Sequence, residues 1–439
     1  MSSGFPRVPV PAVLLVLLAG CGGKYSSSGS SSSGATTVNV AFAPVAPSAV
    51  AVQIGSGTYT TETPASGALS FSLPSGTTTF AVAYICTPTP LTVGGVQYVS
   101  TLETVVEAGT ADGTSATLPC LYSLQGGAQA NPPGQTGALA VNINASAIPS
   151  ASSLLVVAAN GNHATEQNYT EANASGSFAA PVGTDRVEVF AMDSSGNVVA
   201  ARNLTSQTVP GSLNGGSAIV LGSADETRPE PMTFDNFPSQ FGSPGAGVLF
   251  NMGSNSIPIG FATTEYPALP AGAMENGDSY TLSAGAARIL PSAVTESVSV
   301  SVNSTSAGPM TFNFPAPWSY AGPTPAARPT FDFSGYAGFS GKPGNAYGAG
   351  LFWTDGTNGT IGTSQYSVGI SASANYLNGA TSITIPDLSG LHGFLPAPPT
   401  GTDVTWSAQI IQSGSSVLSA TQPNSTLSAA GNQGTFIVP

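Results

Sequence analysis

Two stretches of sequence decide the fold: PSGTTTFAVAYIC at residues 74–86 and PVGTDRVEVFA at residues 181–191. Each opens with a Pro-x-Gly turn signal and then places apolar residues at every second position, from Phe80 to Cys86 in the first copy and from Val187 to Ala191 in the second. Alternate residues of a β-strand point to opposite faces of the sheet. Both stretches therefore predict a strand with one buried face.

The same signals surround both strands in the same order. Val38-Asn39-Val40 precedes the first copy as Val141-Asn142-Ile143 precedes the second, and Ala65-Ser66-Gly67 corresponds to Ala174-Ser175-Gly176. Short strands at this spacing favour a β-sandwich of immunoglobulin-like or transthyretin-like size. We therefore expect two tandem β-sandwich modules, at residues 38–125 and 137–223, the second a weak repeat of the first. Further strands are expected at Ala49 to Ile54, Leu69 to Leu73, Tyr98 to Val106, Leu154 to Ala159 and Ala218 to Leu221.

Composition agrees with an all-β class. Of 439 residues, 53 are Gly and 36 are Pro, and only 7% are charged, against roughly 25% in an average soluble protein. Long surface helices need charged residues on their wet face, so this composition excludes them and favours short strands joined by turns. The net charge of −13 makes nucleic acid a poor partner.

The rest of the chain differs in character. A breaker cluster, Asn131-Pro132-Pro133-Gly134, separates the two modules, and a charged, Pro-containing boundary near 224–231 introduces a C-terminal β region at 232–439. A Pro-rich break at 323–329 leaves open whether this region is one domain or two sub-modules. Its expected strands are Gly247 to Phe250, Glu296 to Val302, Met310 to Phe314, Gly350 to Trp353, Tyr366 to Ser371, Ser382 to Ile385 and Val404 to Ile411.

The N-terminus carries an export signal. Arg7 precedes an apolar run, Val8 to Leu18, which is too short to span a membrane and ends in the small residues Ala19 and Gly20. Leu18-Ala19-Gly20-Cys21 resembles the lipobox of bacterial lipoproteins, in which signal peptidase II removes the signal before a lipidated cysteine. The resemblance implies a signal peptide at 1–20, recognition through Leu18, Ala19 and Gly20, and lipid on Cys21. An ordinary secretory signal with an incidental cysteine is the alternative.

Residues 21–37 support the lipoprotein interpretation. After Cys21 the tract is rich in Gly, Ser and Thr with one charge, Lys24, and such a tract is a flexible linker. The whole chain resembles the Ser/Thr/Gly-rich, low-charge surface lipoproteins of bacteria, many of unassigned function. We therefore expect an exported protein, lipid-anchored to the bacterial membrane (the outer membrane where the cell has one) and either periplasmic or surface-exposed.

Two cysteines remain in the exported chain, Cys86 and Cys120. An even number of cysteines in an oxidising compartment predicts a disulfide. Two free buried thiols are the alternative.

The search for catalytic groups is mostly negative. The two histidines, His163 and His392, are far apart in sequence, and no Ser-His-Asp arrangement, phosphate loop or Cys/His metal site is visible. We expect no cofactor, no metal and no enzymatic activity. The remaining catalytic alternative is a glycosidase, which needs two carboxylates at a fixed separation. Its candidate acids are Glu265, Glu275, Asp278, Asp332, Asp355 and Asp387.

Aromatic residues among amides, hydroxyls and glycines suggest a glycan-binding site. Trp318 and Tyr320 are flanked by prolines and are the candidate exposed pair, with core packing as the alternative. Trp353 is a further candidate, in the core or at its rim. Trp406 alternates with apolar residues and is expected in the core.

Three hypotheses follow. The first is a non-enzymatic, lipid-anchored envelope protein whose C-terminal region binds glycan or adheres, presented on a stalk of two modules. The second is a purely structural envelope or matrix component with protein partners. The third is a carboxylate-dependent glycoside hydrolase.

Overall fold

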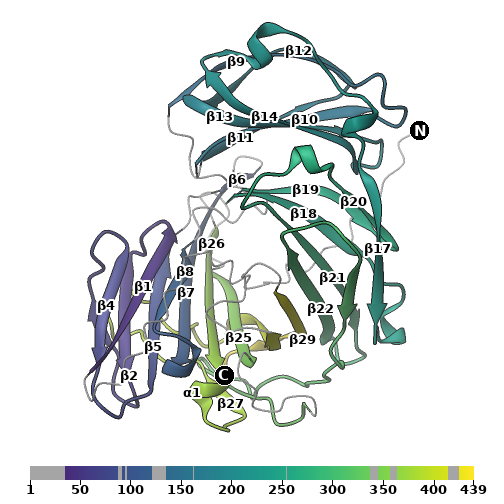
Figure 1. Ribbon diagram of the computed structural model, residues 1–439. Coiled ribbons are helices and arrows are strands. Elements are labelled where there is room, and N and C mark those ends of the chain that lie inside the picture. Colours follow the sequence, from purple (N-terminus) through teal and green to yellow (C-terminus); the bar gives the residue numbers. More distant parts are fainter. Residues whose placement is uncertain are drawn as a thin grey trace.

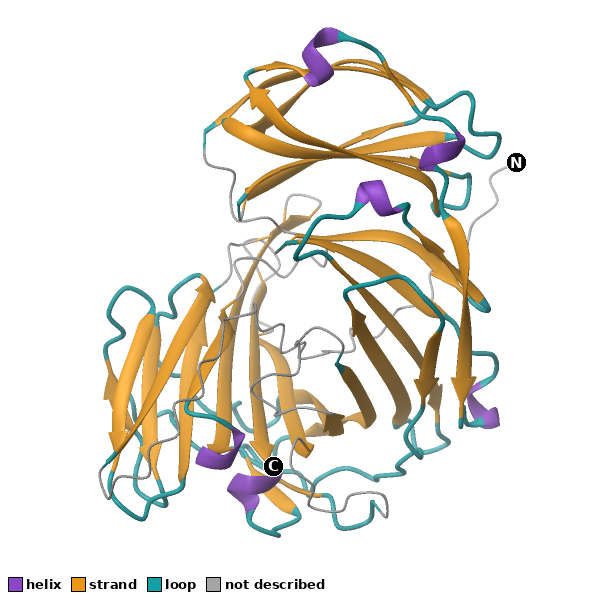
Figure 2. Ribbon diagram, in the orientation of Figure 1, coloured by secondary structure: helices purple, strands orange, loops and turns teal. Residues whose placement is uncertain are grey.

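A computed structural model describes residues 35–87, 91–93, 96–120, 135–161, 163–253, 255–336, 345–355, 363–413 and 425–439. These residues form an all-β protein of several sheets, so the predicted fold class is confirmed (Figures 1 and 2). The α-helix among them, α1, has four residues, Ala374–Leu377. No helix in the described ranges is long and apolar enough to cross a membrane.

The first unit, module 1, consists of two sheets that face each other. Its strands are β1 (Thr36–Pro44), β2 (Ala49–Ile54), β3 (Thr60–Glu62), β4 (Ala68–Leu73), β5 (Thr79–Cys86), β6 (Leu91–Val93), β7 (Val96–Gly109) and β8 (Ser115–Cys120). One sheet has the order β4-β1-β8, and the other has the order β3-β2-β5-β7. Val40, Leu73, Val82 and Tyr84 contribute to the core between them.

Module 2 repeats this pairing pattern. Its strands are β9 (Thr136–Asn144), β10 (Ser153–Asn160), β11 (His163–Tyr169), β12 (Asn173–Pro181), β13 (Gly183–Met192), β14 (Val198–Val209), β15 (Gly211–Ser212) and β16 (Ile219–Val220). The sheet β12-β9-β15 corresponds to β4-β1-β8, and β11-β10-β13-β14 corresponds to β3-β2-β5-β7. In both units the first strand pairs antiparallel with the fourth and parallel with the last strands.

The C-terminal region supplies the other strands. They are β17 (Arg228–Asp235), β18 (Ala246–Met252), β19 (Asn255–Ala262), β20 (Glu265–Ala268), β21 (Ser279–Ile289), β22 (Thr295–Ser304), β23 (Met310–Asn313), β24 (Thr330–Asp332), β25 (Asn345–Asp355), β26 (Thr363–Ser373), β27 (Ser382–Thr384), β28 (Asp403–Ser413) and β29 (Thr426–Ile437). β22 pairs with β29, from the other side of the Pro323–Pro329 break. That break therefore does not divide the region into two separate sandwiches.

One large sheet runs through the molecule in the order β19-β18-β21-β22-β29-β28-β25-β26-β7-β5-β2-β3. Its C-terminal and module 1 sections meet where β26 pairs parallel with β7. Figure 1 shows the sheet curving, with the small sheet β20-β17-β23 on its outer side. Module 1 is thus continuous with the C-terminal region, and module 2 also lies against that region, so the modules do not stand in line as a stalk.

β5 is buried on both faces, which differs from the half-buried strand that its alternation predicts. Phe80, Val82 and Tyr84 pack in the core of module 1. Ala83 and Ile85 point to the other face and belong to the core of the C-terminal region. The predicted alternation is present, but the second face is apolar as well because another part of the chain covers it.

The disulfide between Cys86 and Cys120 is confirmed. It joins the end of β5 to the end of β8, and both cysteines are almost fully buried. It therefore links the two facing sheets of module 1.

Replacing both cysteines by alanine is expected to lower the free energy of unfolding by about 3–4 kcal/mol, because the bridge closes a loop across a sequence separation of 34 residues. Urea denaturation of the C86A/C120A variant and of the oxidised wild type measures the difference. A loss below about 1 kcal/mol would contradict this role.

Candidate functional site

The inward face of the large sheet carries small polar side chains. In β22, Val298 and Val300 point outward into the core, whereas Ser297, Ser299 and Ser301 alternate with them and point inward. In the neighbouring strands the inward positions hold polar residues and glycines interspersed with apolar residues, among them Leu249, Ala287, Ile289, Leu427 and Ala429. We define the polar face as Asn251, Ser256, Ser279, Thr281, Ser283, Ser297, Ser299, Ser301, Asn303, Thr405, Ser407, Gln409 and Gln433.

The polar face is inward because apolar layers cover the outer face. Tyr266 of β20 packs edge-on against Tyr280 of β21 with ring centroids 5.8 Å apart, which seats the small sheet on the outside. In the described parts of β18, β19, β21, β22, β25, β26, β28 and β29, Asp403 is the single charged residue among the inward positions. The polar face is therefore uncharged over most of its extent.

Hydrogen bonds connect side chains across one end of the polar face. The Ser256 hydroxyl donates to Asn251 Oδ1 (2.6 Å), and Asn251 Nδ2 donates to Thr281 Oγ1 (2.8 Å). The Thr281 hydroxyl donates to Asn303 Oδ1 (2.6 Å), and Asn303 Nδ2 donates to Ser425 Oγ (3.4 Å). Because each amide is held on both sides, this ladder fixes the polar surface in one arrangement.

An exposed aromatic residue begins a row that crosses the same face. Phe261 of β19 pairs with Gly247, which pairs with Ser283, which pairs with Ser301. Phe261 is 66% exposed, and a Cβ placed on Gly245 would come within 2.4 Å of its ring. The ring therefore rests on the bare backbone of Gly245, and most of its surface is exposed. We call Phe261, Gly247, Ser283 and Ser301 the Phe261 row.

Module 2 holds the start of this row in place. The backbone N–H of Phe261 donates to Asn197 Oδ1 (3.1 Å). Asn197 ends the β13–β14 hairpin, where its own N–H donates to Asp193 Oδ1 (2.9 Å), as does that of Ser195 (2.8 Å). The hairpin thus contacts β19 directly.

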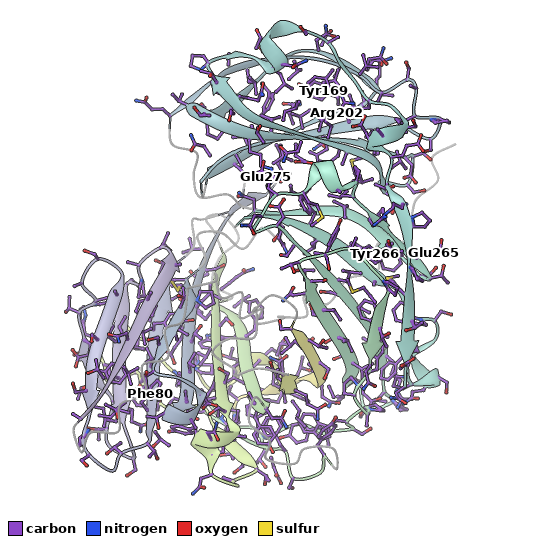
Figure 3. The ribbon with its side chains drawn as sticks, in the orientation of Figure 1. Phe80, Tyr169, Arg202, Glu265, Tyr266 and Glu275 are labelled. Carbon is purple, nitrogen blue, oxygen red and sulfur yellow. A yellow bond between two sulfur atoms is a disulfide. The ribbon has the colours of Figure 1, made fainter. Side chains whose placement is uncertain are left out.

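A buried ionic joint connects module 2 to the C-terminal region. Arg186 of β13 donates to both oxygens of Asp278 at 2.8 Å and to Glu188 Oε2 at 3.2 Å. Asn203 of β14 donates to Glu275 Oε1 at 2.8 Å, and Figure 3 shows Glu275 at the boundary between the two parts. Glu275 and Asp278 were both predicted as candidate catalytic acids. They lie close together in the structure, and both are engaged in these contacts with module 2.

The other candidate acids do not form a pair. Asp332 and Asp387 each accept a hydrogen bond from the backbone of the serine two residues later. The backbone bond from Ser334 lowers the pKa of Asp332, and the side-chain and backbone bonds from Ser389 lower the pKa of Asp387. Glu265 is exposed, and the side chain of Asp355 lies outside the described part of the structure. In the described ranges, no group of three or more His, Cys, Asp or Glu side chains is placed to hold a metal ion.

Trp318 and Trp353, two of the three predicted glycan-stacking residues, are buried, which corrects the prediction for them. Trp318 is 2% exposed because Tyr320 stacks on one face of its indole (4.8 Å between centroids) and Phe333 on the other (5.2 Å). Trp353 is 4% exposed and stacks on Tyr366. Trp406 is buried, as its alternation predicts.

The proline-rich segment around Trp318 covers the sheet and does not project from it. The carbonyl of Trp318 accepts a hydrogen bond from Asn432 Nδ2 on β29, and the N–H of Tyr320 donates to Asn432 Oδ1 (3.4 Å). Tyr320 is half-buried, edge-on to Trp406. Flanking prolines therefore do not indicate exposure here.

The lipobox residues Leu18, Ala19, Gly20 and Cys21 lie outside the described residues. No protein-family model and no curated protein sequence matches this chain.

Because Trp318 is a core residue, its replacement by alanine is expected to lower the free energy of unfolding by about 3–5 kcal/mol. Ile437, which is 61% exposed, is the control, and I437A is expected to change stability by less than about 0.5 kcal/mol. Urea denaturation of both variants measures the effects. Equal stability of W318A and wild type would show that the indole is not buried.

Buried carboxyls make the stability depend on pH. Burial raises the pKa of Glu188 to about 8, of Glu107 to about 7 and of Asp185 to about 6. Each group keeps its proton in the folded state at a pH where the unfolded chain has lost it, so stability falls as pH rises from about 4.5 to 8.

We expect the melting temperature to fall as the pH rises from about 4.5 to about 8. Glu188→Gln should flatten the fall between pH 4.5 and pH 8, and the exposed Glu265→Gln should leave it unchanged. Differential scanning fluorimetry of the wild type and both variants across this pH range measures the melting temperatures. A melting temperature that rises with pH would contradict the assignment.

Proposed function

We propose that the protein is a non-enzymatic, lipid-anchored component of the bacterial cell envelope that binds a polysaccharide through the polar face and the Phe261 row. The observation that carries the proposal is the combination of an exposed aromatic ring with a broad, uncharged surface of hydroxyl and amide groups. Sugar rings offer apolar faces and many hydroxyls, so they match such a surface.

Sequence and fold together support the anchored arrangement. The lipobox-like residues Leu18 to Cys21 are followed by a Gly/Ser/Thr tract, and β1 begins at Thr36 where this tract ends. The linker thus leads directly into the folded body. A lipid on Cys21 would hold that body near the membrane surface and leave the polar face for an envelope or extracellular polymer.

The ionic joint favours binding over hydrolysis. A glycosidase needs an acid and a second carboxylate on the two sides of a reachable bond. Here Asp278 is 3% exposed and engaged by Arg186 through both oxygens, and Glu188 is fully buried. These acids hold two parts of the protein together, and the exposed Phe261 row contains none.

Phe261→Ala tests the proposal. Removing an aromatic anchor is expected to weaken polysaccharide binding about tenfold or more and to leave the melting temperature unchanged, because the ring is mostly exposed. Affinity gel electrophoresis of the full-length chain against embedded polysaccharides measures the retardation.

Ile289→Ala is the matched control, since Ile289 is another inward residue of the large sheet, 78% exposed and at the far end of β21. It should bind as the wild type does. An equal loss of polysaccharide binding in both variants, or no loss of binding in F261A, would contradict a specific role of the Phe261 row.

A further inference from the structure

Every arginine in the described ranges already has a carboxylate partner. The pairs are Arg186 with Asp278, Glu188 and Glu275; Arg202 with Asp225; Arg228 with Glu230; Arg288 with Glu296; and Arg328 with Glu103. None of these arginines occupies an inward position of the polar face. The described part of the surface therefore offers no unpaired guanidinium for an anionic ligand.

The net charge of the whole chain also disfavours an anionic ligand. The sequence has 21 acidic residues and 8 basic ones. An anionic polymer would meet repulsion from this excess, and it would lose hydration at the polar face without gaining a cation from the described residues in return. A neutral polymer is not repelled by the net charge, and it has no charged group that must lose its hydration.

The Phe261 row also has the dimensions and the hydrogen-bonding groups for a chain of sugars. Strands lie about 4.8 Å apart, so the row spans roughly 14 Å from Phe261 to Ser301, the length of about three hexose units. The hydroxyls of Ser283 and Ser301 lie 2.9 Å apart. That bond uses one of their two protons, so the pair still has one proton to donate and lone pairs to accept.

We infer that the ligand of the polar face is an uncharged polysaccharide, one sugar of which stacks on Phe261 while its neighbours bond to Ser283 and Ser301. This inference rests on the proposed function and narrows it to one chemical class. Uronate-containing and sulfated chains are excluded from the site by their negative charge. Hydrogen bonds from their sugar hydroxyls alone do not offset the repulsion and the loss of hydration of the anionic groups.

Matched polymers test the inference. The full-length chain is tested by affinity electrophoresis against dextran and dextran sulfate, and against hydroxyethyl cellulose and carboxymethyl cellulose, at 50 and 500 mM NaCl. We expect retardation by at least one neutral polymer, at least tenfold weaker binding to its anionic counterpart, and no effect of salt on the neutral binding. Equal or tighter binding to the anionic counterpart, weakened by salt, would overturn the inference and leave the proposed polysaccharide binding intact. Binding to none of the four would overturn both.

A charge introduced into the Phe261 row tests whether the ligand binds along this row. Ser283→Lys places a cation at an exposed inward position, and it is expected to gain salt-sensitive binding to dextran sulfate. Ser175→Lys, on an exposed position of β12 in module 2, adds the same charge away from the face and is the control. If S283K binds dextran sulfate no more tightly than S175K does, the ligand does not lie along this row and the inference fails.

Discussion

Parallel pairing of β7 with β26 joins two parts of the chain that are more than 250 residues apart in sequence. The register runs from Tyr98 and Thr363 to Glu107 and Ala372. Polar side chains support it at one end, where Asp112 accepts hydrogen bonds from Ser373 (2.5 Å) and Asn375 (2.6 Å). Without this pairing, module 1 would be a separate sandwich and the C-terminal strands would end in a free edge at β26, which is costly for an exposed sheet.

The polar face depends on this continuity. A single sheet with an apolar outer face, covered by the β20-β17-β23 sheet and by the segment around Trp318, must present its other side chains inward. In the C-terminal section those positions are rich in serine, threonine, asparagine, glutamine and glycine, with apolar residues such as Leu249, Ile289 and Leu427 among them. Module 2 adds the remaining constraint, since Arg186 and Asn197 fix it against the strands that carry Phe261.

Local pattern predicted strands such as β2, β5 and β28 but missed β19, β21 and β29, and it predicted the tertiary surfaces poorly. Alternation located β2 and β5 because each has a real apolar face, and the even pair of cysteines indicated the disulfide. Nothing local shows that the second face of β5 is covered by the C-terminal region. In an uninterrupted strand, Phe261 would point to the same face of the sheet as the buried Ile257 and Ile259. An irregularity in the β18–β19 pairing turns its side chain to the opposite face. Likewise, Trp318 is buried by Phe333 and Tyr320, a contact that composition cannot reveal.

Hydrogen–deuterium exchange of the full-length chain, followed by mass spectrometry, tests the continuous sheet most directly. A strand paired on both sides exchanges its amides slowly, whereas a free edge exchanges quickly. The account predicts that peptides from β7 and β26 are protected to the same degree as those from β28 and β29. Rapid exchange in β26 together with slow exchange in β28 and β29 would show that the sheet ends there, and would contradict the continuous sheet.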